Sequence, residues 1–173
     1  MKTLKTSVYL VMLCATVLFT ACKSDDNNNE GDGDGGGGGG GQGTEFLTAK
    51  VDGVSFEAAQ DPAVIVGASV SNTIMSFQGG KNNGETIRGT INGYNGVGTY
   101  RTGDNITNLN SLSFITISPV ATWVSTFDIG SGTIEITSDD GTTIEGKFSF
   151  EGFNAAGQTT KNITQGNFKA IID

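Results

Sequence analysis

The sequence predicts an all-β protein, and three observations support this class. Short runs rich in Thr, Ile, Val and Phe recur from residue 44 to residue 173, and Gly, Asn and Asp interrupt them. No helical period of apolar residues extends beyond a turn or two in this region. Apolar and polar residues alternate around Asp-Gly pairs, as they do in hairpins. We therefore expect an antiparallel β-sandwich of about ten short strands, or alternatively a closed up-and-down β-barrel of the lipocalin type.

The clearest strand pair lies at the start of this region. Asp52-Gly53 is typical of a two-residue type I′ turn, and it separates residues 46–51 from residues 54–58. A turn at this point places Ala49 opposite Phe56 and gathers the apolar residues on one face. The turn chemistry and the alternation thus predict the same register.

A second hairpin is predicted across residues 133–153. A three-residue loop, Asp139-Asp140-Gly141, pairs Ile136 with Ile144 and places Glu135 opposite Glu145. This register buries one apolar face, made by Ile134, Ile136, Ile144, Phe148 and Phe150.

The remaining strands are shorter and are separated by turn residues. They are expected at residues 63–70, 73–78, 86–92, 96–101, 111–118, 121–127 and 163–172. Seven phenylalanines are expected to fill the core, namely Phe56, Phe77, Phe114, Phe127, Phe148, Phe150 and Phe168. We treat residues 44–173 as a single β-domain.

Residues 1–21 have the pattern of a signal peptide. Lys2 and Lys5 precede an apolar run over residues 8–19, which is shorter than the roughly 20 residues that a membrane-spanning helix needs. The following Phe19-Thr20-Ala21-Cys22 resembles the lipobox of bacterial lipoproteins, although phenylalanine replaces the usual leucine. The resemblance implies cleavage after Ala21 and acylation of Cys22, which anchors the chain to a membrane.

Residues 22–43 form an expected spacer, rich in Gly, Asp and Asn and free of apolar side chains after the cysteine. Such a composition predicts a disordered tether. Lys23-Ser24-Asp25-Asp26 resembles the acidic export signal of surface lipoproteins in Bacteroidota. We expect an outer-membrane location facing the cell surface, with a periplasm-facing orientation as the alternative.

The charge and the missing residue types restrict the function. The 173 residues carry 18 acidic and 10 basic side chains and no histidine, for a formal net charge of -8. This balance argues against a nucleic-acid partner. Cys14 lies in the signal peptide and Cys22 is the acylation site, so the mature chain has neither a free thiol nor a histidine. We expect no enzymatic activity, no catalytic residue, no cofactor and no metal site.

Three aromatic side chains are the candidate ligand contacts. Trp123, Tyr94 and Tyr100 can each combine ring stacking with a hydrogen bond. If Trp123 is exposed near either tyrosine, the group would suit a sugar or a peptide. The alternative is that Trp123 and Tyr100 belong to the core.

Several short motifs together resemble a family. Ala49-Lys50-Val51-Asp52-Gly53 comes first, Gly98-Thr99-Tyr100 lies mid-chain, and the last third contains Gly146-Lys147-Phe148 and Gly166-Asn167-Phe168. This set resembles a domain-of-unknown-function family of Bacteroidota lipoproteins. The resemblance implies an all-β fold and lipidation, and it supplies no catalytic residue or ligand.

These observations predict a lipid-anchored, surface-exposed, non-catalytic β-domain that acts as a binding or interaction module for a glycan or a protein. One alternative is a small β-barrel that carries an apolar ligand. Another is a structural protein of the envelope.

Overall fold

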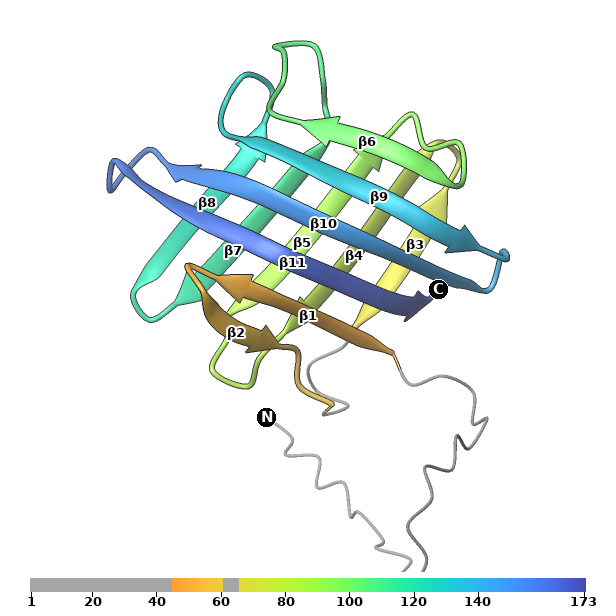
Figure 1. Ribbon diagram of the computed structural model, residues 1–173, viewed down its shortest axis with the longest axis horizontal. Helices are drawn as coiled ribbons and strands as arrows, with labels where there is room; N and C mark the ends of the chain where they lie inside the picture. The colour runs from red at the N-terminus through yellow and green to blue at the C-terminus, as the bar shows by residue number, and fades with distance from the viewer. Residues whose placement is uncertain (1–44, 61–65) are drawn as a thin grey trace, which may run out of the picture. The chain divides into compact units, whose positions relative to one another are not determined.

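The computed structural model describes residues 45–60 and 66–173, which belong to one compact unit. The all-β prediction is confirmed, since eleven antiparallel strands make up the structure (Figure 1). Within these residues no helix is long and apolar enough to cross a membrane. The strands are β1 (Phe46–Val51), β2 (Val54–Glu57), β3 (Gly67–Ser71), β4 (Ile74–Gly80), β5 (Thr86–Asn92), β6 (Gly98–Thr102), β7 (Ser111–Ile117), β8 (Val120–Thr126), β9 (Ser131–Asp139), β10 (Thr143–Asn154) and β11 (Thr159–Ile171).

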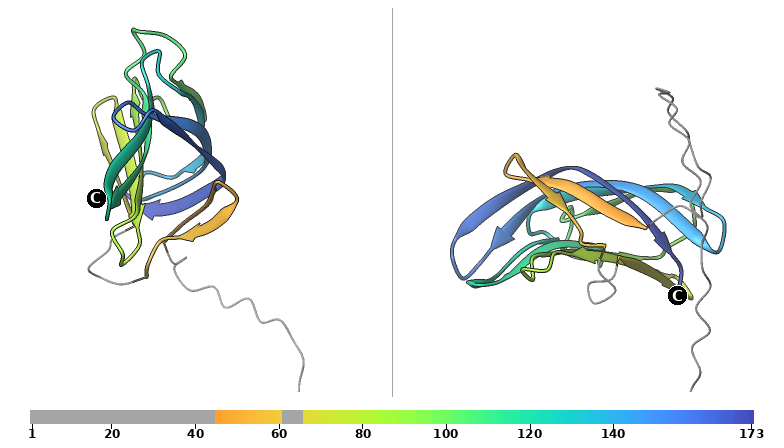
Figure 2. Two further views of the ribbon diagram at one scale, coloured as in Figure 1. Left: turned by 90° about the vertical axis from the view of Figure 1, so that its left-hand side faces the viewer. Right: turned by 90° about the horizontal axis from the view of Figure 1, so that it is seen from below.

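All eleven strands belong to one curled sheet whose two halves face each other. We call the half made of β2, β1, β11, β10, β9 and β6 the front layer, and the half made of β8, β7, β5, β4 and β3 the back layer. The layers join where β8 meets β10, and the two strands pair only at Val124 and Phe153. The strands of the two layers cross each other (Figure 1), and the layers lie face to face when viewed from the side (Figure 2).

The sheet has features of both architectures that the sequence left open. Its two facing layers match the expected sandwich, but a single path of strand pairing connects them. The curl is that of a half-barrel, and within the described strands the ends of the path, β2 and β3, do not pair with each other. An isolated bridge between Ala68 and Ile172 ties β3 to the end of β11. Buried apolar side chains occupy the space between the layers.

The first hairpin has the predicted register. Ala49 pairs with Phe56, and Val51 pairs with Val54. Asp52 and Gly53 have φ angles of 49° and 83°, as a type I′ turn requires. Val54 was expected to share a face with the other apolar residues of the hairpin, and 69% of it is exposed.

The second hairpin has the predicted buried face but a different register. Asp139 pairs with Ile144, so the loop is longer than predicted, and after a bulge between Glu145 and Gly146 Ile136 pairs with Gly146 rather than with Ile144. As a result Glu135 lies opposite Lys147, and the predicted like-charge pair does not form. The five apolar residues expected on the buried face, Ile134, Ile136, Ile144, Phe148 and Phe150, are all buried.

Six of the seven predicted core phenylalanines are buried, and Phe127 is not. Phe127 follows the end of β8 in the turn that leads to β9, with a φ angle of 52° and 39% exposure. The left-handed backbone at this position turns the chain away from the layer. The sequence prediction had extended the strand by one residue too many.

Glycine and phenylalanine repeatedly face each other across neighbouring strands. In three pairs a β-carbon added to the glycine would lie under 3.0 Å from the ring of its partner. Each ring therefore covers the space that the missing side chain leaves on the inner face. The pairs are Gly146 with Phe168, Gly166 with Phe148, and Gly89 with Phe77.

Candidate functional site

The structure brings two of the three predicted ligand contacts together. The ring centroids of Tyr94 and Tyr100 are 5.9 Å apart. Tyr94 is buried, with 8% exposure, and its hydroxyl donates to Asp139 Oδ2 at 2.5 Å. The pKa of Tyr94 is raised, mainly by burial and secondly by the hydrogen bond to Asp139. Tyr100 Oη donates to the carbonyl oxygen of Gly96 at 2.8 Å. Both hydroxyls thus bond to groups of the fold itself.

Trp123 lies in a different environment. It is half-buried on β8, its ring centroid lies 5.8 Å from that of Phe114, and its Nε1 donates to Thr159 Oγ1 at 3.0 Å. Lys161 Nζ lies 5.0 Å from the ring centroid, a cation–π distance. Among the described aromatic pairs, none joins Trp123 to either tyrosine. Trp123 and Tyr100 both pack against the core, which was the alternative interpretation of the sequence.

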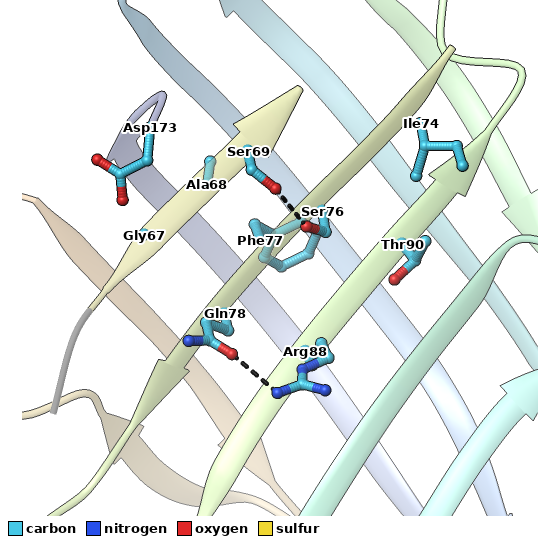
Figure 3. Close-up of a pocket in the computed structure, with 10 residues that line it drawn as sticks. All are labelled: Gly67, Ala68, Ser69, Ile74, Ser76, Phe77, Gln78, Arg88, Thr90 and Asp173. Carbon is cyan, nitrogen blue, oxygen red and sulfur yellow. Dashed lines mark hydrogen bonds between the residues drawn. The ribbon is translucent and has the colours of Figure 1, made fainter. Parts of the chain in front are cut away.

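A groove of about 550 Å³ lies on the outer face of the back layer, over β3, β4 and β5 (Figure 3). Alternation along each strand creates this face. Met75 and Phe77 of β4, and Ile87 and Ile91 of β5, point into the core, so the residues between them point outward. The outward side chains that line the groove are Ser69, Ile74, Ser76, Gln78, Arg88 and Thr90, and Asp173 lies beyond β3.

A row of hydroxyl groups crosses this face. Successive partners across the five strands are all serine or threonine, which places neighbouring residues about 4.8 Å apart. Ser69 Oγ and Ser76 Oγ are hydrogen-bonded at 2.9 Å. The row contains Ser69, Ser76, Thr90, Ser111 and Thr126.

Arg88 lies in the neighbouring row, between Gln78 on β4 and Ser113 on β7. It is exposed, and one guanidinium nitrogen donates to Gln78 Oε1 at 3.0 Å. The ion pairs of the described residues involve three lysines and do not include Arg88. Its guanidinium thus contacts a neutral amide and faces solvent within the groove.

The two layers differ sharply in charge. Across the five strands of the back layer, Arg88 is the only residue with a charged side chain. The front layer contains every other charged strand residue: Lys50, Glu57, Arg101, Glu135, Asp139, Glu145, Lys147, Glu151, Lys161 and Lys169. The outer face of the back layer is therefore almost free of charge, and it exposes Ile74, Ile117 and Val120 beside its hydroxyl and amide groups.

The outer face of the front layer also has two depressions, of about 340 and 240 Å³. Charges of both signs line them. Arg101, Asp104 and Glu151 line the larger depression, and Glu135 and Lys147, which lie opposite each other across the strands, line the smaller one. Carboxylates thus accompany the cations in both depressions.

In the acidic loop between β9 and β10, the aspartate carboxylates accept hydrogen bonds from the backbone amides of the same loop. Asp139 Oδ1 accepts from the Gly141 amide at 2.9 Å, and Asp140 Oδ1 accepts from the Thr142 and Thr143 amides at 2.9 and 2.7 Å. The hydrogen bond from Thr143, followed by that from Thr142, lowers the pKa of Asp140. Within the described part of the chain, no three His, Cys, Asp or Glu side chains gather in a geometry that suits a metal ion. The carboxylates of this loop thus stabilise the turn.

Residues 43–172 match the family model described as "Domain of unknown function (DUF6252)". The chain belongs to this family. The match spans all eleven strands, and therefore both layers and the groove. No curated protein and no solved structure matches the chain. The predicted resemblance to a domain-of-unknown-function family is thus confirmed. The predicted acylation site Cys22, the cleavage position after Ala21 and the spacer at residues 22–43 lie outside the described residues.

Sequence reasoning missed the groove and Arg88. The available signal was the absence of charge from five predicted strands, with one arginine among them. Reading that signal requires knowing that β3, β4, β5, β7 and β8 form one layer, and this depends on the order of strand pairing. The aromatic side chains were the more visible candidates, but they pack into the fold.

Proposed function

We propose that the protein is a lipoprotein of the outer membrane in a member of the Bacteroidota and that it presents a non-catalytic binding module to the cell exterior. The supporting observations are the charged and apolar pattern of residues 1–21, the lipobox at Phe19-Thr20-Ala21-Cys22, and the polar composition of residues 22–43. Lys23-Ser24-Asp25-Asp26 supports the outward orientation.

The binding surface in this proposal is the outer face of the back layer. The observation that supports it is that five adjacent strands expose hydroxyl, amide and aliphatic groups with a single charge among them. The cores of interaction surfaces are depleted in charged residues, because desolvating a charge opposes binding. The front layer, whose strands contain ten charged residues of both signs, has the composition of a solvated surface.

Membrane attachment is tested with Cys22→Ala. The variant should move from the membrane fraction to the soluble fraction after cell lysis, because acylation supplies the anchor. Continued membrane association would contradict the proposed lipidation. For the wild type, external protease should degrade the β-domain on intact cells if the domain faces outward, and should leave it intact if the domain faces the periplasm.

Binding is tested with residues 44–173, which contain the whole described core. A glycan and peptide array should reveal a ligand class whose binding Ser76→Tyr reduces, since the ring would fill the groove between β3 and β5. Ser149→Tyr adds the same side chain to the outer face of the front layer and is the matched control. A ligand blocked by Ser149→Tyr alone would assign binding to the other layer.

A further inference from the structure

We propose that the groove around Arg88 binds the acidic groups of a polysaccharide. This inference rests on the proposed binding function of the same face and names the ligand class. It follows from the state of Arg88, from the distribution of charge over the two layers, and from the groups that line the groove.

Arg88 has an unused capacity to bind an anion. A guanidinium presents five N–H donors in a planar fork that fits a carboxylate or a sulfate through two parallel hydrogen bonds. In this structure the hydrogen bond to Gln78 Oε1 uses one nitrogen, and none of the ion pairs among the described residues includes Arg88. Gln78 therefore orients the guanidinium without neutralising it.

The back layer is also the part of this acidic protein that an anion can approach. The formal net charge is -8, yet no strand of the back layer contains a carboxylate. Acidic side chains near this face include Asp173, which lines the groove beyond β3, and Glu85, which precedes β5 and pairs with Lys81 at 2.9 Å. Since Asp173 is the acidic residue of the groove lining within the described part of the chain, its removal should strengthen binding.

The remaining groups suit a sugar chain better than a peptide. Hydroxyls of Ser69, Ser76 and Thr90 line the same groove as Arg88 and can exchange hydrogen bonds with sugar hydroxyls. Ala68, Ile74 and Phe77 are the apolar residues of the lining, and since Ala68 and Phe77 are 5% and 2% exposed, Ile74 is the apolar side chain that a peptide could reach. The outward positions of the five strands contain no aromatic ring that could stack on a neutral sugar. Attraction between charges must then supply much of the affinity, which points to an acidic polysaccharide.

The test measures binding of residues 44–173 to three immobilised probes: polygalacturonate, dextran sulfate and neutral dextran. The wild type should bind one or both acidic probes, more weakly as salt increases, and should not bind dextran. Preference for polygalacturonate would identify a carboxylate as the recognised group, and preference for dextran sulfate would identify a sulfate. Arg88→Gln should weaken binding about tenfold or more, because a hydrogen bond between charged groups is lost. Arg88→Lys should weaken it less, since the charge remains but the fork is lost.

Two further variants complete the test. Arg101→Gln removes an exposed positive charge from the front layer and should leave binding unchanged, whereas Asp173→Asn should increase it. Equal loss in Arg88→Gln and Arg101→Gln would show a non-specific effect of net charge and overturn the proposal. Absence of binding to both acidic probes would also overturn it. If the array then found a peptide or neutral glycan that Ser76→Tyr blocks, the proposed binding function would stand without this inference.

Discussion

The ring of Phe77 stacks on the ring of Phe168, with centroids 4.1 Å apart and planes inclined by 5°. Phe77 comes from β4 in the back layer, and Phe168 comes from β11 in the front layer. Phe148 of β10 also lies against the Phe77 ring, and the centroids of these two rings are 5.5 Å apart. This stack is a direct contact between the two layers, and it lies beneath the strand that carries Ser76 and Gln78.

Loss of this stack should destabilise the fold strongly. Phe77→Ala removes a ring that is 2% exposed, so we expect a loss of about 3–5 kcal/mol in the free energy of unfolding. Phe127→Ala is the matched control, because that ring is 39% exposed in a turn, and it should cost less than about 1 kcal/mol. Urea unfolding followed by tryptophan fluorescence measures both. Similar losses in the two variants would contradict the assigned core.

The facing glycine and phenylalanine pairs lead to a second prediction. Gly166→Ala would place a methyl group against the ring of Phe148, and overpacking of this kind costs about 1–3 kcal/mol. Gly98→Ala is also in a strand, but the nearest atom to its added carbon is 3.9 Å away. There the substitution should be neutral or slightly stabilising. Thermal unfolding distinguishes the two, and an undisturbed melting temperature in Gly166→Ala would refute the close packing.

Tyr94 should contribute to stability rather than to ligand binding. Tyr94→Phe removes the hydrogen bond to Asp139 and should cost about 1.5–3 kcal/mol, in the range for bonds to a charged group. Polysaccharide binding should stay unchanged, since Tyr94 does not line the groove around Arg88. A loss of binding without a loss of stability would return Tyr94 to the role of ligand contact that the sequence suggested.

Asp52 should make stability depend on pH in the acidic range. Lys161 Nζ donates to Asp52 Oδ2 at 2.8 Å and the Asn162 amide donates to Oδ1 at 2.9 Å, which hold the pKa of Asp52 below its ordinary value of 3.8. Because folding lowers this pKa, the contribution is present above about pH 4 and is lost as the pH falls through the lowered value. Asn tolerates the same left-handed turn, so Asp52→Asn keeps the hairpin.

Unfolding at pH 7 and at pH 3 tests this contribution. The wild type should exceed Asp52→Asn by a margin of about 0.2–1 kcal/mol at pH 7, the range for exposed ion pairs, and the margin should shrink at pH 3. A margin that is independent of pH would exclude the ion pair as its source.

Local sequence patterns predicted the strands well, and they failed where pairing depends on more distant contacts. Asp52-Gly53 specified its hairpin because the turn chemistry and the apolar alternation agreed. At the second hairpin the hydrogen bonds that Asp139 and Asp140 accept from backbone amides stabilise a different loop, and the bulge at Glu145 restores the apolar face after it. A bulge of this kind leaves no clear mark in a sequence.

The Gly-x-Phe motifs show the same limit. Gly146-Lys147-Phe148 and Gly166-Asn167-Phe168 look like ordinary strand segments when each is read alone. In the structure they are neighbours on antiparallel strands, so the glycine of each faces the phenylalanine of the other. The reason for the glycines is therefore visible only from the pairing of β10 with β11. The charge-poor face likewise became visible only from the order of the strands.

The most direct test of the proposed binding face is an NMR titration of ¹⁵N-labelled residues 44–173 with oligogalacturonate. Amide shift changes should concentrate on β3, β4 and β5, with the largest changes near Ser76, Arg88 and Thr90. Changes concentrated on β9, β10 and β11, or none with either oligogalacturonate or sulfated dextran oligosaccharide at millimolar concentration, would contradict it.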